Sequence, residues 1–128
     1  MGKRYRFPVE PIVKSNGNCP SKEFYDELDK PVKAKFNGIF KRIEKSADGF
    51  LRDRDKLRKL HGKHTGDLWE MRVRYNGIWY RILCFRAGPA WKLTHGFTKK
   101  SNDTFIGEIE KGVAIKNEYC ANIKWGEA

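Results

Sequence analysis

Cysteine is scarce in this chain of 128 residues, and its placement argues against the folds that depend on it. Cys19, Cys84 and Cys120 are odd in number and widely spaced, and none belongs to a Cys-x-x-Cys pair. Disulfide frameworks and zinc ribbons need paired or closely spaced cysteines, so both are disfavoured. Cys84 stands in the apolar run ILCF. There we expect a small buried thiol rather than a reactive nucleophile.

Long apolar runs and several enzyme motifs are also missing. No run approaches the roughly 20 residues that span a bilayer, and no signal-peptide-like segment follows the basic start of the chain. We therefore expect a cytoplasmic protein with no membrane partner. A Walker loop, Gly-x-Gly-x-x-Gly, Gly-x-Ser-x-Gly and an evident carboxylate pair are absent, which leaves nucleotide-driven and serine-hydrolase chemistry poorly supported. The length and 13% aromatic content predict a single domain over residues 1–128.

Acidic residues are few beside basic ones. The chain has 16 Asp and Glu against 27 Lys and Arg, a formal net charge of +11. Most of the excess lies in residues 51–100, which hold 13 basic and 4 acidic residues. Such a concentration favours an anionic partner, because phosphates release counterions when Lys and Arg approach them. Charge alone leaves a nucleic-acid partner and a merely solvated surface as open alternatives.

The first part of the chain predicts one strand followed by two helices. Residues 5–14 are extended in character, and their two prolines confine them to an edge or bulged strand. A turn leads to a short helix over residues 22–28, for which Ser21 is the expected N-cap. A second helix begins near Pro31 and repeats apolar residues at helical spacing up to Ile43. We expect the two helices to form a hairpin that covers one side of a sheet.

The second part predicts a three-stranded meander and a final helix. Residues 46–66 are polar and are expected to be mainly a connecting loop. Apolar and charged residues alternate over 67–75, and Asn76-Gly77 is a strong hairpin signal before an apolar strand over 78–86. A third strand over 90–97 precedes the helix. That helix is expected to point three apolar side chains inward: Phe105, Ile109 and Val113. The order predicts an α+β domain with a mostly antiparallel sheet.

Arg81 is a single charge within the otherwise apolar second strand of the meander. A buried guanidinium is costly unless it is paired or opens onto a site. Two interpretations stay open: a buried pair with Glu70 on the preceding strand, or an arginine presented to a phosphate. They are compatible, because a carboxylate can orient a guanidinium that binds a ligand.

Further cations surround this strand. Arg72 and Arg74 share a strand face with Glu70, which predicts a basic surface on the sheet rather than a basic tail. Both could equally be ordinary exposed arginines. Lys99 and Lys100 follow the third strand, and they can join a site on the sheet only if that loop folds back over it.

Three histidines are candidates for proton transfer, because histidine titrates near neutral pH. His95 lies in the last strand, whereas His61 and His64 flank the loop before the meander. The spacing His61-x-x-His64 is compatible with a metal, but no third ligand is evident, so no metal site is expected. For His95 alone, a packed histidine is an alternative to a catalytic one.

Several short segments stand in a specific order along the chain: CPSKEF at 19–24, KL at 59–60, DLWEMRVR at 67–74, WYRIL at 79–83, THGFTKK at 94–100, EIE at 108–110 and EY at 118–119. Together they resemble the RelE/HigB toxin superfamily, in particular its phage-derived HigB-like branch. The similarity covers about residues 5–119. It implies a small RelE-like α+β domain, with an N-terminal edge strand, a three-stranded meander, a helical hairpin on one side and a C-terminal helix.

The resemblance also implies an activity. Members are toxins of bacterial type II toxin–antitoxin pairs, and many are endoribonucleases that cleave mRNA in the ribosomal A site without a metal or cofactor. Arg81 matches the arginine beside the scissile phosphate, Arg72 matches a basic position on the preceding strand, and Lys100 matches another phosphate-binding cation. The ribose 2′-hydroxyl would attack the adjacent phosphate while cations stabilise the phosphorane. Four further cations are expected to bind RNA: Lys59, Lys63, Arg74 and Lys99.

Two departures alter the proton-transfer scheme. Glu70 stands where the RelE prototype has a lysine on the second strand, and Phe105-Ile106 stands where it has a tyrosine. The prototype's scheme therefore cannot be carried over intact. His95 is the candidate base, with His61 or His64 in reserve.

The resemblance implies partners and alternatives as well. A small helix-turn-helix antitoxin, HigA-like, is the expected protein partner, beside the ribosome and mRNA. One alternative is a ParE-like toxin that acts on DNA gyrase. Another is a non-catalytic RNA-binding domain or a degenerate toxin.

Overall fold

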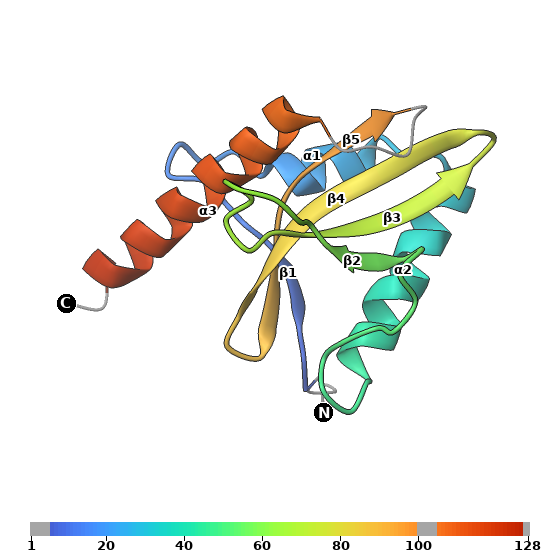
Figure 1. The fold of residues 1–128 in the computed structure, drawn as a ribbon, viewed down its shortest axis with the longest axis horizontal. Helices are drawn as coiled ribbons and strands as arrows, with labels where there is room; N and C mark the ends of the chain where they lie inside the picture. Colours follow the sequence, from blue (N-terminus) through green and yellow to red (C-terminus); the bar gives the residue numbers. More distant parts are fainter. Residues whose placement is uncertain (1–5, 100–104, 127–128) are drawn as a thin grey trace.

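The computed structural model describes residues 6–99 and 105–126 of the chain. A first strand is followed by two helices, four strands and a final helix (Figure 1), and the α+β class is confirmed. The elements are β1 (Val9–Pro11), α1 (Pro20–Asp26), α2 (Lys30–Glu44), β2 (Leu57–Lys59), β3 (Trp69–Tyr75), β4 (Ile78–Ala87), β5 (Ala90–Lys99) and α3 (Ile106–Gly126). Among the described helices, none combines the length and apolarity needed to cross a membrane.

The sheet has five strands in the order β1-β5-β4-β3-β2. Strands β2 to β5 pair antiparallel, whereas β1 runs parallel to β5. The expected edge position of the first strand is confirmed, and it accommodates Pro11, which has no N–H to donate to a second neighbour. The hairpin at Asn76-Gly77 is also confirmed, with both residues at positive φ as a type I′ turn requires.

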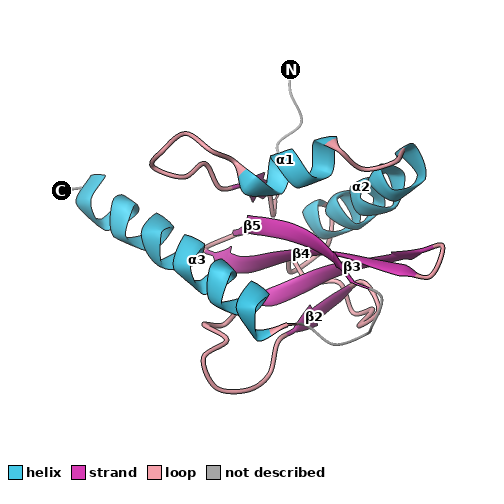
Figure 2. Ribbon diagram, turned by 90° about the horizontal axis from the view of Figure 1, so that it is seen from above, coloured by secondary structure: helices cyan, strands magenta, loops and turns pink. Residues whose placement is uncertain are grey.

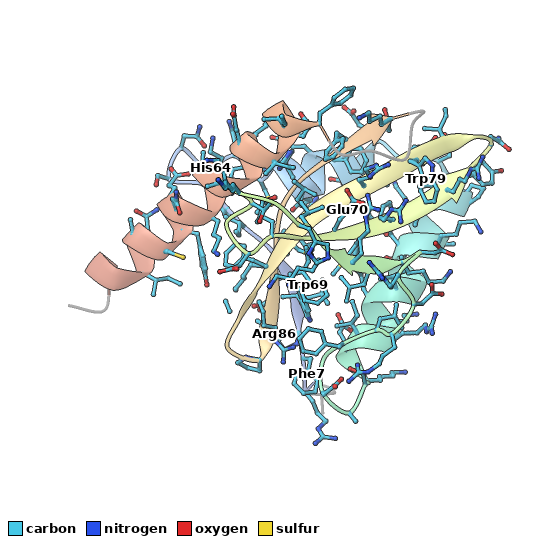
Figure 3. All side chains as sticks on the ribbon, in the orientation of Figure 1. Phe7, His64, Trp69, Glu70, Trp79 and Arg86 are labelled. Atoms are coloured by element: carbon cyan, nitrogen blue, oxygen red, sulfur yellow. The ribbon has the colours of Figure 1, made fainter. Side chains whose placement is uncertain are left out.

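Strand β2 was not predicted, because it is only three residues long and lies within the expected connecting loop. It pairs antiparallel with β3, with Leu57 opposite Met71, and forms the second edge strand of the sheet. The loop before it is fixed by Trp91, whose indole Nε1 donates to the carbonyl of Gly49 at 2.6 Å. Arg86 lies against the ring of Phe7 nearby, with its guanidinium 4.9 Å from the ring centroid (Figure 3). The Trp91 hydrogen bond therefore ties the polar loop to β5.

Helices α1 and α2 lie on one side of the sheet (Figure 2), and the main core lies between them and the strands. The expected helical hairpin is therefore confirmed. Its N-cap prediction was wrong: α1 begins at Pro20 after Cys19, and Ser21 is buried within the first turn. The buried residues of this core are Val32, Phe36, Ile39, Ile43, Leu57, Met71, Val73, Ile82, Cys84, Trp91 and Leu93.

Helix α3 packs on part of the opposite face of the sheet, around a smaller core that includes Leu83 and Ile115. Gly112 lets the helix approach closely, because a Cβ there would lie 2.9 Å from Leu68 Cδ1. Ile109 and Val113 pack against this core as expected, but Phe105 is 57% exposed. Phe105 precedes the first helical residue, so helical spacing does not direct it inward.

Cys84 has no exposed surface and donates a hydrogen bond from its thiol to the carbonyl of Trp69 at 3.6 Å. Burial raises the pKa of this thiol well above its ordinary value, so it stays protonated at neutral pH. The expected buried, unreactive cysteine is confirmed.

Candidate nucleic-acid interface

Strand alternation places the polar side chains of β3 on one face of the sheet. Glu70, Arg72 and Arg74 point to the face opposite the α1–α2 core, because Met71 and Val73 point into that core. The antiparallel register then sets Arg72 across from Arg81 and Arg74 across from Trp79. Three arginines and a tryptophan therefore gather at one end of this face.

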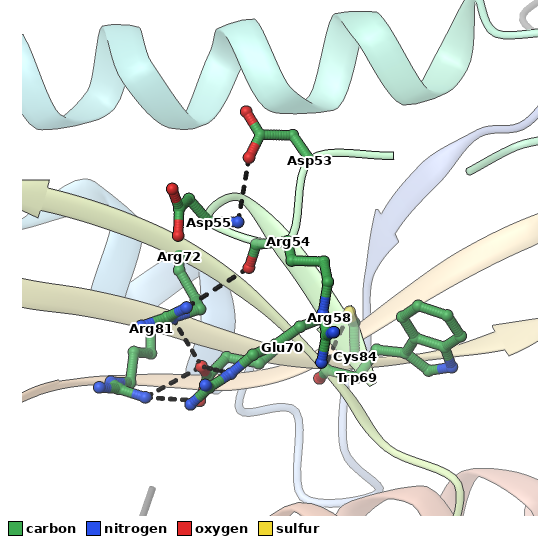
Figure 4. A network of polar contacts seen from close by, with 9 residues as sticks. All are labelled: Asp53, Arg54, Asp55, Arg58, Trp69, Glu70, Arg72, Arg81 and Cys84. Carbon is green, nitrogen blue, oxygen red and sulfur yellow. Dashed lines mark hydrogen bonds and ion pairs between the residues drawn. The ribbon is translucent and has the colours of Figure 1, made fainter. Parts of the chain in front are cut away.

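Glu70 is the centre of an ion cluster (Figure 4). Its two carboxylate oxygens each accept a hydrogen bond of 2.9 Å from Nη1 of Arg81. The Nε atoms of Arg58 and Arg72 lie 3.1 and 3.0 Å from Glu70 Oε1. One carboxylate thus binds three guanidinium groups, which leaves an excess of positive charge at this point of the sheet.

Arg81 is fully buried, with 0% of its side chain exposed. The sequence left open a buried pair with Glu70 and contact with a phosphate, and the structure shows the pair. Neighbouring side chains cover the guanidinium in this conformation, so Arg81 offers no surface to a phosphate here. Its role beside a scissile phosphate stays a prediction.

Arg72 lies between the buried cluster and the exposed end of β3, and is itself nearly buried. Its side chain is 4% exposed, its Nη1 donates to the carbonyl of Arg54 at 3.4 Å, and its guanidinium lies 4.1 Å from the ring centroid of Trp79. Burial and the nearby charge of Arg58 lower the pKa of Arg72. An arginine still keeps its charge at neutral pH. Arg72 is therefore a fixed cation backed by an aromatic ring.

A groove of about 560 Å³ opens beside this cation, between α2 and β3. Strand β2 pairs only with the first three residues of β3, so among the described residues the later part of β3 has no strand on that edge. Five basic side chains and one carboxylate line the groove. The lining residues are Lys35, Gly38, Ile39, Arg42, Asp55, Lys56, Arg72, Val73, Arg74 and Trp79. We call this the α2–β3 groove.

Cations together with an indole ring suit a single-stranded nucleic acid. Phosphates are neutralised by the basic side chains, while a base stacks on the ring. Trp79 is half-buried, with Arg74 at 5.6 Å from its ring centroid. The arrangement matches the expected basic sheet surface, and it adds a groove that the strand pattern alone does not show.

Five polar or aromatic groove residues were missed by the sequence analysis: Lys35, Arg42, Asp55, Lys56 and Trp79. A signal existed for three of them. Lys35 and Arg42 are seven residues apart on α2 and so share a helix face, and Trp79 alternates with Arg81 along β4. Asp55 and Lys56 had no such signal, since their place depends on how the loop before β2 folds.

The other predicted RNA-binding cations are distributed differently. Arg74 is exposed in the groove, and Lys99 lies across from Trp79 on β5, with its Nζ 3.1 Å from the ring centroid of Phe105. Lys59 is exposed on β2 and lines a second groove. Lys63 is exposed beside His64, which Figure 3 places near α3 and away from Trp79. Lys100 lies outside the described residues.

His95 is not available as a base in this structure. It is 1% exposed, beneath α3, with Nδ1 3.1 Å from the hydroxyl of Thr94 and Nε2 3.4 Å from a carboxylate oxygen of Glu108. Burial, and to a lesser extent the charge of Lys111, lowers the pKa of His95 to about 4. The ring is neutral at pH 7 and covered by its neighbours, an environment that fits the packed alternative; its role as the catalytic base stays a prediction.

The exposed histidines also do not form a metal site within the described part of the chain. No group of three or more His, Cys, Asp or Glu side chains there is placed to hold a metal ion. His61 and His64 are exposed in the loop after β2, and His64 has a positive φ of 66°.

Comparison with known families decides the broad identity. The family described as phage-derived protein Gp49-like (DUF891) matches residues 23–116, which include the Glu70 cluster and the whole groove. The chain belongs to the Gp49-like family. This family is phage-derived and toxin-like, of the RelE type, so the superfamily resemblance is confirmed at that level. The curated proteins include no match to this Gp49-like chain.

Proposed function

We propose that this Gp49-like chain is the toxin of a type II toxin–antitoxin pair and that its target is messenger RNA on the ribosome, in the cytoplasm. The α2–β3 groove is the observation that carries the proposal. Its five cations, single carboxylate and half-buried indole ring fit a single-stranded RNA segment better than an apolar protein surface. Membership of the toxin-like Gp49 family also supports a toxin role.

The chemistry we propose is metal-independent cleavage of the RNA backbone. The ribose 2′-hydroxyl gives up its proton and its oxygen attacks the adjacent phosphorus. The P–O bond to the 5′ oxygen breaks, that oxygen takes a proton from water, and the products are a 2′,3′-cyclic phosphate and a 5′-hydroxyl. We assign stabilisation of the phosphorane charge to the exposed Arg74, with the nearly buried Arg72 adding positive charge behind it. Such stabilisation by preorganised donors is worth about 3 kcal/mol per donor.

A base is also needed, and the groove offers a new candidate. Asp55 is the one carboxylate among the described residues that line the groove. We assign it to accept the proton of the 2′-hydroxyl, in place of the buried His95. The cations around it also hold the phosphate near that carboxylate.

The protein partner we propose is a small helix-turn-helix antitoxin of the HigA type. A short open reading frame for such a protein beside this gene supports the pairing. Its acidic or apolar segments would compete with RNA for a surface that carries much of the chain's net charge of +11.

Inducible expression in bacteria tests the function. Wild type is expected to halt growth and to produce new mRNA 5′ ends inside translated codons. The double variant Lys56→Ala, Arg74→Ala removes two groove cations and is expected to lose both effects. Lys22→Ala, Lys30→Ala removes the same charge from exposed positions outside the groove and should stay toxic. A fully toxic groove variant would contradict the proposal.

A second candidate, RNA binding without cleavage, is favoured by one observation: Arg81 and His95 are both buried. Asp55→Asn separates the two functions. Cleavage predicts that this variant binds RNA as wild type does but yields no new 5′ ends. If wild type itself arrests growth with intact mRNA, cleavage is wrong, and inhibition of DNA supercoiling in that case would indicate a gyrase-directed toxin.

A further inference from the structure

A second groove, of about 450 Å³, lies on the other side of β2 from the α2–β3 groove. The segment before and within β2 separates the two. Asp55 and Lys56 line the first groove, whereas Arg54, Leu57 and Arg58 line the second. The lining residues of this β2 groove are Phe50, Leu51, Arg52, Arg54, Leu57, Arg58, Lys59, His61 and Trp69.

The chemistry of the β2 groove repeats that of the first. Four lining residues are Arg or Lys, and none of the described lining residues is acidic. Two aromatic rings accompany them: Phe50 and Trp69 are half-buried, with ring centroids 5.4 Å apart. Cations beside partly exposed rings are the combination that binds phosphates and stacks bases of a single strand.

The groove is held in shape before any ligand arrives. Trp69 packs edge-on against Trp91, with ring centroids 5.4 Å apart, and so belongs to the aromatic cluster of the core. The guanidinium of Arg58 is held by Glu70 at 3.1 Å while 26% of its side chain stays exposed. A ligand therefore meets a ring and a cation that need little reordering, which lowers the entropic cost of binding.

The two grooves are linked through the Glu70 cluster. Glu70 binds Arg72, which lines the first groove, and Arg58, which lines the second. Arg72 also donates to the carbonyl of Arg54, a residue of the second groove. Positive charge thus continues across β2 from one groove to the other. Among the described residues that line the two grooves, Asp55 is the single carboxylate.

We propose that the β2 groove is a second subsite for the same single-stranded RNA, so that the strand runs from the α2–β3 groove across β2 to Trp69. The inference rests on the proposed function and extends it, because it names where RNA beyond the reacting nucleotides binds. An acidic peptide would satisfy the cations but would leave the partly exposed rings of Phe50 and Trp69 without the stacking that bases provide. RNA is therefore the occupant we choose.

Binding of labelled oligouridylates of two lengths tests the subsite, with fluorescence anisotropy as the readout. A strand of about four nucleotides is short enough for one groove, and one of about twelve can reach both. Arg54→Ala, Lys59→Ala removes two exposed cations of the β2 groove. We expect this variant to raise the Kd for the long strand about tenfold at low salt and to change the Kd for the short strand less than about twofold.

The matched control is Lys22→Ala, Lys30→Ala, which has the same charge change on exposed positions outside both grooves. Thermal unfolding should show that both variants fold as wild type does. An unchanged Kd for the long strand, or an equal loss for both lengths, overturns the second subsite while leaving the first groove intact.

Two further outcomes separate the possibilities. If wild type binds neither oligonucleotide, the second subsite is overturned, while growth arrest and new mRNA 5′ ends on induction decide the RNA target separately. If a hexaglutamate peptide binds wild type as tightly as the long RNA does, and Arg54→Ala, Lys59→Ala abolishes that binding, the β2 groove is a protein-docking site and the subsite is overturned.

Discussion

Single residues decide which cations reach RNA and which do not. The sequence predicted that Glu70 and Arg81 could pair, because the hairpin register brings their strands together. It could not show that Arg81 is sealed, since burial depends on side chains from other elements. Removing one partner of a buried ion pair typically costs about 3 to 5 kcal/mol, because the other charge stays buried. The Glu70–Arg81 pair therefore contributes to stability whether or not it also serves a site.

His95 gives a prediction at this scale. Its folded-state pKa of about 4 is below the ordinary value of 6.5, so the unfolded chain binds the proton more readily. The free energy of unfolding should be constant with respect to this group above pH 6.5 and should fall as pH decreases from 6.5 to 4. The full loss is about 3 kcal/mol.

Urea unfolding of wild type and His95→Gln between pH 4 and pH 8 measures this effect. In the variant, the free energy of unfolding should fall less steeply between pH 6.5 and 4, because the His95 contribution is gone. Glu108 and Lys111 still face that position in both proteins, so their own contributions remain. Identical pH dependence in the two proteins would show that His95 is as accessible to protons in the folded state as in the unfolded one.

At the level of elements, close contacts between helices and strands determine the grooves. Pattern analysis predicted α1, α2, α3 and the meander, because each has a clear apolar period or turn signal. It missed β2, whose three residues carry too little pattern, although β2 separates the two grooves. Where α1 lies on the sheet is decided by Gly96 of β5, since an added Cβ there would meet the ring of Phe24 at 2.0 Å.

Gly96→Ala is therefore expected to destabilise the protein. The ring of Phe24 cannot move away without separating α1 from β5, and overpacking of this kind typically costs about 1 to 3 kcal/mol. Gly38→Ala in α2 is the matched control, because its Cβ would meet nothing within 4 Å. It should stabilise by about 0.5 to 1 kcal/mol through helix propensity. Chemical denaturation measures both, and an unchanged stability for Gly96→Ala would contradict the close contact.

Across the whole molecule, the distribution of charge matters more than its total. The net charge of +11 would attract any polyanion, but the structure concentrates cations in two grooves beside aromatic rings. Composition predicted the anionic partner in general terms. It could not predict the grooves, because Lys35 and Arg42 on α2 meet Arg72 and Arg74 on β3 only through tertiary packing.

The salt dependence of RNA binding tests this distribution. Each phosphate contact with a single strand contributes about 0.7 to the slope of log Kd against log salt concentration. Lys35→Ala, Arg42→Ala should reduce the slope by about 1.4, because both cations line the α2–β3 groove. Lys22→Ala, Lys30→Ala should leave the slope nearly unchanged. Equal reductions for the two pairs would indicate diffuse attraction by net charge.

The sequence by itself determined the α+β class, the order of its main elements, the hairpin at Asn76-Gly77 and the toxin-like resemblance, because these depend on local periodicity and short motifs. Only the tertiary structure decided that Arg81 and His95 are buried and that Asp55 and Trp79 line a groove. The reason is physical: exposure depends on which distant side chains cover a residue. A sequence pattern specifies the strand face toward which a side chain points but not what lies above it.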